Sequence, residues 1–285
     1  MKPVERARHV WTRFRQIAAF GRTGFATSDK LKMLVVGYAR GHNFGANDLI
    51  SRIGRTLFPE IAVRPSSLGG LTLHLDPSNL SHLVVADEIV REQVYDLNLV
   101  PFTPDLILDC GAHIGMFALL AGATFPKSKL VAFEPDPENS RWLRRQIEAN
   151  HLPVDVVQAA LSNEEGEVFF EAGQGCGGSL ADASAVSSTA IRVKSVDLAS
   201  YLAKCDIKNL LLKLDVEGAE ENLLPKIINV LPQNSFLFFE THGGKESWNC
   251  LSGILEERGF VTKVTRAHDI YTDGIAVRNS SITAS

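Results

Sequence analysis

Short apolar runs alternate with amphipathic stretches through the second part of the chain. Strands that are apolar on both faces are typical of a parallel sheet covered by helices on both sides. We expect five such strands, at residues 106–108, 129–133, 154–161, 210–214 and 236–239. Helices are expected between them, at residues 116–120, 137–150, 220–228 and 247–258. The pattern therefore predicts an α/β fold.

The last two extended segments close this pattern differently. Residues 260–265 and 269–278 are separated by too few residues for a crossover helix. They must therefore pair in antiparallel fashion. We expect a mostly parallel sheet that ends in an antiparallel C-terminal hairpin.

The pattern before residue 88 is different and predicts a small N-terminal cap over residues 1–87. Residues 1–30 interleave basic and apolar positions as in a basic amphipathic helix, and residues 31–60 are also helical in pattern. Residues 61–64 and 71–75 flank a turn-like segment and predict a hairpin. The basic helix either packs on its own domain or docks on an anionic membrane surface or acidic partner. Residues 88–285 form the second domain, which opens with a helix at 88–97.

An insertion interrupts the second domain at about residues 166–196. Two further strands are expected there, at residues 167–170 and 191–196. The segment between them is rich in Gly, Ser and Ala, as flexible loops are. We expect it to act as a mobile lid, with a simple linker as the alternative.

Composition narrows the class of protein. The chain has 285 residues, 45% of them hydrophobic, so it can bury a large core. A net charge of −4 disfavours a dedicated nucleic-acid binder. The four cysteines show no paired spacing, and no apolar run approaches the ~20 residues that span a bilayer. We expect a cytoplasmic protein without a transmembrane segment.

A glycine turn follows the first expected strand. Gly111 can adopt backbone angles closed to other residues, and Gly115 allows strand and helix to approach closely. Amide groups at the start of the next helix are then expected to face a ligand. The second strand ends at Glu134, whose carboxylate can accept hydrogen bonds from both hydroxyls of a ribose. Together these features predict a site for an adenosine-containing ligand.

Polar residues that follow the fourth and fifth strands are the catalytic candidates. They are Lys213, Asp215, Glu217, Glu240 and His242. Period-two alternation puts Lys213 and Asp215 on one side of their strand, and a lysine in an apolar strand needs a carboxylate partner. We nominate His242 as the general base, because imidazole titrates near neutrality, with Glu240 orienting it or the substrate. The alternative is a solvated His242 at the start of a loop.

The same residues have a competing use. Asp215, Glu240 and His242 would offer oxygen and imidazole ligands to a divalent ion such as Mg or Mn. Nothing in their spacing demands an ion, and we assign no metal from the sequence.

Five ordered segments resemble the FkbM family of methyltransferases. They read LDCGAHIG at 108–115, AFEPDP at 132–137, AALS at 159–162, GEV at 166–168 and KLDVEGAE at 213–220. Cys110 and His113 stand where the family usually has Ile and Asn. The likeness covers residues 88–278. It implies a Rossmann-like, seven-stranded fold, S-adenosylmethionine as methyl donor, and a hydroxyl acceptor on a sugar or another natural product.

The resemblance also implies roles for individual residues. The amino-acid end of the donor would be held by Asp109, Gly111, Ala112, His113, Ile114 and Gly115. The ribose would be held by Glu134 with Pro135, and the adenine by Ala160, Leu161 and Ser162. The acceptor would then lie beside the catalytic candidates already placed at the strand ends, Lys213, Asp215, Glu240 and His242. An NAD-dependent oxidoreductase shares the acid after the second strand, but leaves the antiparallel ending and the segment after the fourth strand unexplained. A noncatalytic nucleotide-binding scaffold is the third hypothesis.

Overall fold

The computed structural model describes residues 60–65, 68–76, 79–171, 190–268 and 271–279. The chain divides into two compact units, Met1–Gln93 and Val94–Ser285. The helices predicted within residues 1–60 and the loop at 172–189 lie outside the described residues. Among the helices that are described, none has the length and apolar character needed to span a membrane.

The described part of the first unit contains the predicted hairpin. Strands β1 (Ile61–Val63) and β2 (Leu73–Leu75) pair in antiparallel register, with Ala62 opposite His74. Helix α4 (Leu80–Asp87) and the π-helical segment η2 (Glu88–Glu92) follow. The continuous helix predicted at 88–97 is wrong, because Gln93 adopts a left-handed conformation and ends η2. A short 3₁₀ turn, η3 (Leu97–Leu99), opens the second unit separately.

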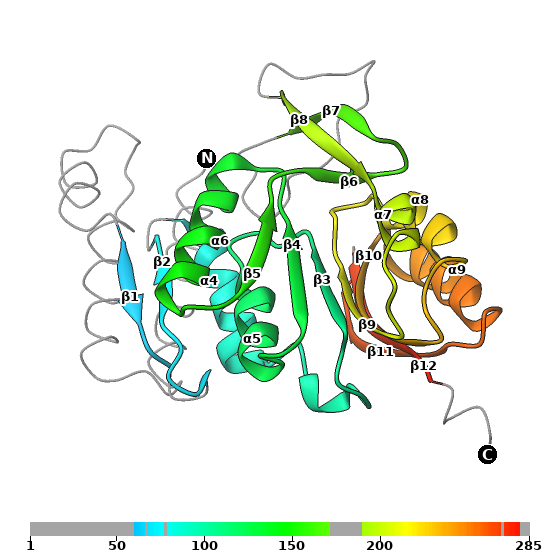
Figure 1. Cartoon of the computed structure of the whole chain (residues 1–285), viewed down its shortest axis with the longest axis horizontal. Helices are drawn as coiled ribbons and strands as arrows, with labels where there is room; N and C mark the ends of the chain where they lie inside the picture. The colour runs from blue at the N-terminus through cyan, green and yellow to red at the C-terminus, as the bar shows by residue number, and fades with distance from the viewer. Residues whose placement is uncertain (1–59, 66–67, 77–78, 172–189, 269–270, 280–285) are drawn as a thin grey trace, which may run out of the picture. The chain divides into compact units, whose positions relative to one another are not determined.

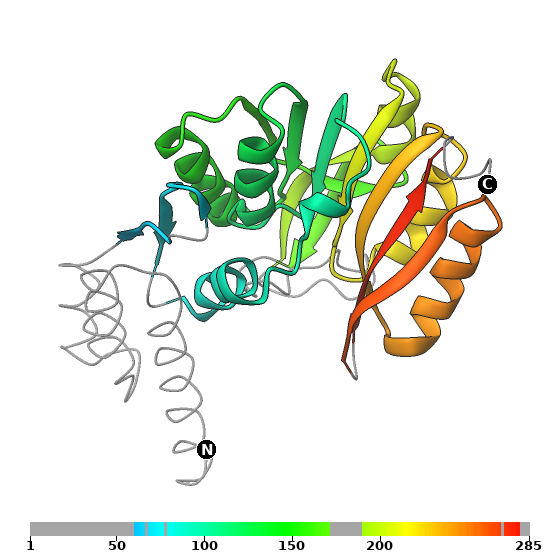
Figure 2. The same cartoon turned by 90° about the horizontal axis from the view of Figure 1, so that it is seen from below.

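A seven-stranded sheet forms the second unit and confirms the predicted fold class (Figure 1). Its strand order is β11-β12-β10-β9-β3-β4-β5. Strands β5, β4, β3, β9 and β10 are parallel, whereas β12 is antiparallel to both β10 and β11. Figure 2 shows this closing hairpin at one end of the sheet. The strand bounds are β3 (Leu106–Cys110), β4 (Lys129–Phe133), β5 (Val154–Val157), β9 (Asn209–Leu214), β10 (Asn234–His242), β11 (Val261–Ala267) and β12 (Tyr271–Arg278).

Helices cover both faces of the sheet, as the apolar strands predict. Alternate residues of β3 face opposite cores: Leu106 and Leu108 pack with α7, α8 and α9, and Ile107 packs with α5 and α6. The helices are α5 (Met116–Thr124), α6 (Pro137–Ala149), α7 (Leu198–Ala203), α8 (Glu220–Ile227) and α9 (Gly244–Glu256). Asp136 caps the start of α6, because its carboxylate accepts hydrogen bonds from the amides of Glu138 and Asn139.

The insertion forms a separate three-stranded sheet in the order β6-β8-β7. Strands β7 (Gly166–Glu171) and β8 (Ala190–Asp197) confirm the predicted pair. The single strand predicted at 154–161 is wrong. The chain pairs with β4 only as far as Val157, and β6 (Ala160–Ser162) then pairs with β8 instead.

Gly111 follows β3 directly and lies against the backbone of Asp215, which follows β9. Its φ is +81°, and a Cβ atom built on it would lie 1.7 Å from the carbonyl oxygen of Asp215. The amide of Asp215 in turn donates to the carbonyl of Cys110 at 3.1 Å. A glycine is therefore required by both conformation and space.

We predict that Gly111→Ala destabilises the fold strongly. Positive φ costs about 1–3 kcal/mol, and the clash with the Asp215 carbonyl adds about 1–3 kcal/mol of overpacking. Urea unfolding monitored by circular dichroism measures the change. Gly253→Ala is the matched control, because this glycine lies inside α9 with no atom near the added methyl group, and we expect a gain of about 0.5–1 kcal/mol. Equal midpoints for Gly111→Ala and the wild type would contradict the close approach.

Candidate functional site

The carboxyl ends of β3, β4, β9 and β10 meet at one edge of the sheet. The chain leaves β3 towards α5 on one face, and leaves β9 towards α8 on the other. Adjacent parallel strands whose connections diverge in this way leave a crevice between their ends, where α/β proteins bind ligands. The edge between β3 and β9 is therefore the candidate site.

Strand register brings the predicted polar side chains to one face. Lys213 is paired with Asp109 on one side and with Phe238 on the other. Paired residues share a face, and so do residues two apart, so Asp215, Glu240 and His242 also project to this side. Because β10 continues to His242, this residue ends the strand, so the alternative of a solvated His242 at the start of a loop is wrong.

The glycine turn is held by its own hydrogen bonds. The amides of Gly111 and Ala112 both donate to the carbonyl of Phe133, at 3.2 and 2.9 Å. The amide of His113 donates to the Glu134 carboxylate at 2.7 Å, and that of Gly115 to the Ala112 carbonyl at 2.8 Å. These four amides are therefore satisfied within the turn. The expectation that amides at the start of α5 face a ligand stays a prediction. The turn shapes the site through its backbone path.

Glu134 lies at the end of β4 with only 4% of its surface exposed. Its two carboxylate oxygens accept hydrogen bonds from the amides of His113 and Asp136, at 2.7 and 2.9 Å. Burial raises the pKa of Glu134 to about 7, although both amide bonds oppose this shift. Each oxygen keeps a lone pair for a further donor. The side chain is thus fixed in place and able to accept hydrogen bonds from a ligand.

A buried lysine connects the ends of β3 and β9. Lys213 is 5% exposed, and its Nζ donates to the carbonyl of Gly111 at 2.6 Å. The same nitrogen lies 3.1 Å from Asp215 Oδ2 and 3.7 Å from Asp109 Oδ1, which confirms the predicted neighbourhood of Lys213 and Asp215. Burial opposes the charge, yet the two carboxylates keep the pKa of Lys213 well above its ordinary value.

Asp109 is fully buried beside this lysine. Its Oδ2 accepts the amide of Ala118 in α5 at 3.1 Å, whereas its Oδ1 has no hydrogen-bond partner. Burial raises the pKa of Asp109 to about 6, and the ammonium of Lys213 opposes the shift. Asp109 therefore fixes the start of α5 through Oδ2, and its Oδ1 makes no hydrogen bond.

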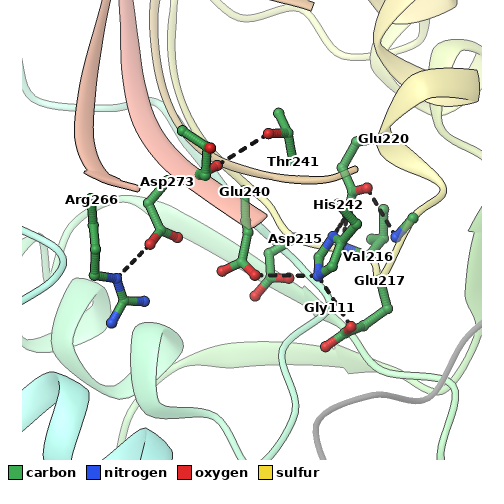
Figure 3. A network of polar contacts seen from close by, with 12 residues as sticks. Gly111, Asp215, Val216, Glu217, Glu220, Glu240, Thr241, His242, Arg266 and Asp273 are labelled. Atoms are coloured by element: carbon green, nitrogen blue, oxygen red, sulfur yellow. Dashed lines mark hydrogen bonds and ion pairs between the residues drawn. The ribbon is translucent and has the colours of Figure 1, made fainter. Parts of the chain in front are cut away.

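His242 lies among three carboxylates (Figure 3). Its Nε2 is 3.1 Å from Glu217 Oε2 and 3.2 Å from Glu240 Oε1, and its Nδ1 is 3.3 Å from Glu220 Oε1. Burial would lower the pKa of His242, but the three carboxylates outweigh it and raise the pKa well above the ordinary value. An imidazolium holds its proton, so this arrangement argues against His242 as the general base.

The pKa values of two neighbouring carboxyl groups, Glu240 and Glu217, are raised as well. Burial raises the pKa of Glu240 to about 8, with Asp215 and Asp273 contributing, and also raises that of Glu217. One ligand atom each from Asp215, Glu240 and His242 lies within 4.8 Å of the others. Among the described residues, these three form a group that can hold a metal ion.

The predicted adenine contacts lie in the smaller sheet. Ala160 and Leu161 are buried in β6. The Ser162 hydroxyl lies 2.5 Å from that of Ser195 and donates to the carbonyl of Glu164 at 2.8 Å. Ser162 thus joins β6 to β8, and its contact with adenine stays a prediction.

Tyr95 was not expected at the site. Its ring packs edge-on against Phe117 at 5.0 Å and Phe238 at 5.4 Å. Burial raises its pKa, and the charges of Lys213 and Asp215 also act on its hydroxyl. No spacing in the sequence could identify Tyr95, because it precedes β3 and reaches the site only through packing.

Residues 109–262 match a family model described as the methyltransferase FkbM domain. "Methyltransferase 1" of Beauveria bassiana is 30% identical over 210 residues, which cover 63% of this chain and 81% of that protein. The hexuronic acid methyltransferase AglP of Haloferax volcanii is 26% identical over 162 residues, 57% of this chain and 66% of AglP. The crystal structure of methyltransferase FkbM from Methylobacillus flagellatus is 13% identical, with a TM-score of 0.44 over 88% of this chain and 60% of that one.

We predict that Lys213→Met destabilises the protein by about 3–5 kcal/mol, because it leaves Asp109 and Asp215 without their buried counter-charge. The double variant Lys213→Met/Asp109→Asn should recover part of this loss, since one uncompensated charge is then absent. Urea unfolding of both variants measures the coupling. Lys129→Met removes an exposed lysine at the start of β4 and should change stability by less than about 0.5 kcal/mol. Wild-type stability in Lys213→Met would show that the lysine balances no charge.

Proposed function

The chain belongs to the FkbM methyltransferase family, and we propose that it transfers a methyl group from S-adenosylmethionine to a hydroxyl of a sugar or another natural product. The family assignment confirms the predicted enzyme class. The observation that carries the proposal is the placement of Glu134 and the Asp215, Glu240 and His242 group around one edge of the sheet. The part at β3 and β4, with Glu134, suits the nucleoside of the donor. The part at β9 and β10, with Asp215, Glu240 and His242, suits a hydroxyl acceptor.

The residues at the first part fit the donor. S-adenosylmethionine carries its methyl group on a sulfonium, which makes the sulfur a good leaving group. Glu134 offers carboxylate lone pairs to the ribose hydroxyls, beside Pro135. The Oδ1 of Asp109 makes no hydrogen bond and lies 3.7 Å from the Lys213 ammonium, so it can accept a hydrogen bond from the ammonium of the donor. The turn from Gly111 to Gly115 shapes the adjacent wall. Ala160, Leu161 and Ser162 complete the donor site on the adenine side.

The residues at the second part serve the acceptor. The acceptor oxygen forms a bond to the methyl carbon with a lone pair, the electrons of the C–S bond pass to sulfur, and the hydroxyl proton passes to a carboxylate. Asp215 and Glu240 place two such carboxylates together, and His242 holds Glu240 at 3.2 Å. Alignment of oxygen and methyl carbon can supply up to roughly 7–11 kcal/mol of the barrier. Lys213 keeps the strand ends in place for this alignment.

A sugar hydroxyl is the acceptor class we favour. One relative is named a hexuronic acid methyltransferase, and its match covers 57% of this chain. The family assignment favours methyl transfer over the NAD-dependent oxidoreductase and the noncatalytic scaffold. Cys110, Cys205 and Cys250 are free thiols, which agrees with the cytoplasmic location we propose.

Two measurements test the proposed function. Calorimetry with S-adenosylmethionine and NAD compares the donors directly, and preferential binding of NAD would refute the donor assignment. Transfer of a radiolabelled methyl group to a panel of monosaccharides, hexuronic acids and glycans then identifies the acceptor. Labelled ethers resist mild alkali whereas methyl esters do not, so hydrolysis separates a hydroxyl acceptor from a carboxylate acceptor.

We predict that donor binding tightens as the pH rises through about 7. The raised pKa of Glu134 means that its carboxyl group is mostly protonated below this pH, whereas the ribose hydroxyls require the ionised form. The association constant should rise by up to about tenfold per pH unit between about pH 5.5 and 7 and level off above about pH 8.

Glu134→Gln tests the assignment of this pH dependence. Its side chain is neutral at every pH, so the slope should disappear and donor affinity should fall by about 1–3 kcal/mol. Glu164→Gln, at an exposed carboxylate, should keep both the slope and the affinity. Calorimetry at several pH values measures all three proteins. A slope that survives in Glu134→Gln would assign the titration to another group.

We predict that Glu240→Gln lowers kcat by about 10²–10⁴-fold, because proton transfer by a positioned group contributes this much. Its Kd for S-adenosylmethionine should stay within about twofold of the wild type, since the donor is held at β3 and β4. Initial rates with the identified acceptor provide kcat. Glu246→Gln, at an exposed position in the first turn of α9, should retain wild-type kcat. An unchanged kcat in Glu240→Gln would remove this residue from the reaction.

A further inference from the structure

Among the residues that the structure describes, negative charge exceeds positive charge around His242. Glu217, Glu220 and Glu240 all lie within 3.3 Å of its ring nitrogens. The other cations nearby are already bound, because Lys213 contacts Asp215 and Arg266 forms an ion pair with Asp273 at 2.5 Å. One imidazole therefore faces three carboxylates. Such an excess in a partly buried site favours the binding of a further positive charge.

Three of these groups have the arrangement of metal ligands. Asp215 follows β9, and Glu240 and His242 end β10, so register places their ligand atoms within 4.8 Å of one another. They come from rigid strand ends and point toward one another (Figure 3). Two carboxylates and one imidazole suit Mg²⁺ or Mn²⁺, which favour oxygen ligands and accept one nitrogen.

The position of Glu220 beside His242 is a separate observation that favours a metal site. Its side chain is 1% exposed, and its two oxygens accept hydrogen bonds from the amides of Val216 and Gly218, at 2.7 and 2.9 Å. This fixed carboxylate lies 3.3 Å from His242 Nδ1, on the ring edge opposite Nε2. A histidine that binds a metal through one nitrogen almost always directs the other to a carboxylate or carbonyl. Glu220 therefore lies where it can accept a hydrogen bond from Nδ1 once Nε2, which faces Glu240, binds a metal ion.

We propose that Asp215, Glu240 and His242 bind one divalent cation, and that this cation holds the hydroxyl oxygen of the acceptor. The second half of this inference rests on the proposed function, whereas cation binding does not. A cation at this position takes the place of the Nε2 proton of His242 and balances the carboxylates around the ring. It also orients the acceptor oxygen and favours loss of its proton.

Mn²⁺ titration of the full chain, followed by the electron paramagnetic resonance of free Mn²⁺, tests the site without donor or acceptor. We expect one Mn²⁺ per chain, displaced by excess Mg²⁺. Glu240→Gln and His242→Gln should weaken binding at least about tenfold, because each removes a ligand. Glu220→Gln should weaken it by about 10–100-fold, although it removes none.

Controls separate ligand loss from misfolding and from general charge effects. Glu246→Gln should bind Mn²⁺ as the wild type does, because its carboxylate is exposed on α9. Each variant is also tested for S-adenosylmethionine binding, which reports an intact fold at β3 and β4. A wild-type chain that takes up no Mn²⁺, or a folded Glu240→Gln that binds it unchanged, would overturn the site.

Methyl transfer in the presence of a chelator tests the role of the cation in the reaction. Activity should fall at least about tenfold on chelation and return with Mg²⁺ or Mn²⁺. Undiminished activity in chelator would overturn the role of the cation in acceptor binding. If Mn²⁺ binds as expected but no acceptor is methylated, the proposed function fails and the cation site stands.

Discussion

The contact between the Gly111 turn and the end of β9 is the constraint on which the rest of the site depends. The carbonyl of Gly111 accepts the Lys213 ammonium at 2.6 Å, and the absence of a side chain at Gly111 leaves room for the Asp215 carbonyl. These contacts join the ends of two neighbouring parallel strands whose helices lie on opposite faces. Because that junction is tight, the turn that precedes α5 and the residues that follow β9 have fixed positions.

Charge pairing reinforces this junction. Lys213 is buried, and its charge is tolerated because Asp109 and Asp215 lie on either side of it. Asp109 in turn anchors the first turn of α5 through the amide of Ala118. The donor side and the acceptor side of the site therefore share one electrostatic network. A change at Lys213 is expected to affect both sides, whereas a change at Glu134 affects the donor side.

The acceptor side carries an excess of carboxylates that the fold itself does not neutralise. Glu220 is bound by backbone amides, but Glu217 and Glu240 share a single imidazole. Glu217 is also held in a left-handed backbone conformation with φ +54°, beside Gly218. Folded proteins tolerate such strain and like charge chiefly where function requires them. A bound cation would relieve this imbalance.

The sequence by itself determined the alternation of strands and helices, the antiparallel ending, and the polar residues at the strand ends, because these follow from local periodicity and residue type. Gly111, Glu134 and Lys213 were identified in this way. Tertiary structure alone decided how those ends meet. The pairing of Lys213 with Phe238 places β9 and β10 in register, and no local pattern specifies the register of strands so far apart in the chain. The surroundings of His242 come from three separate segments, so its charge, and with it the role of the site, is set by packing rather than by sequence.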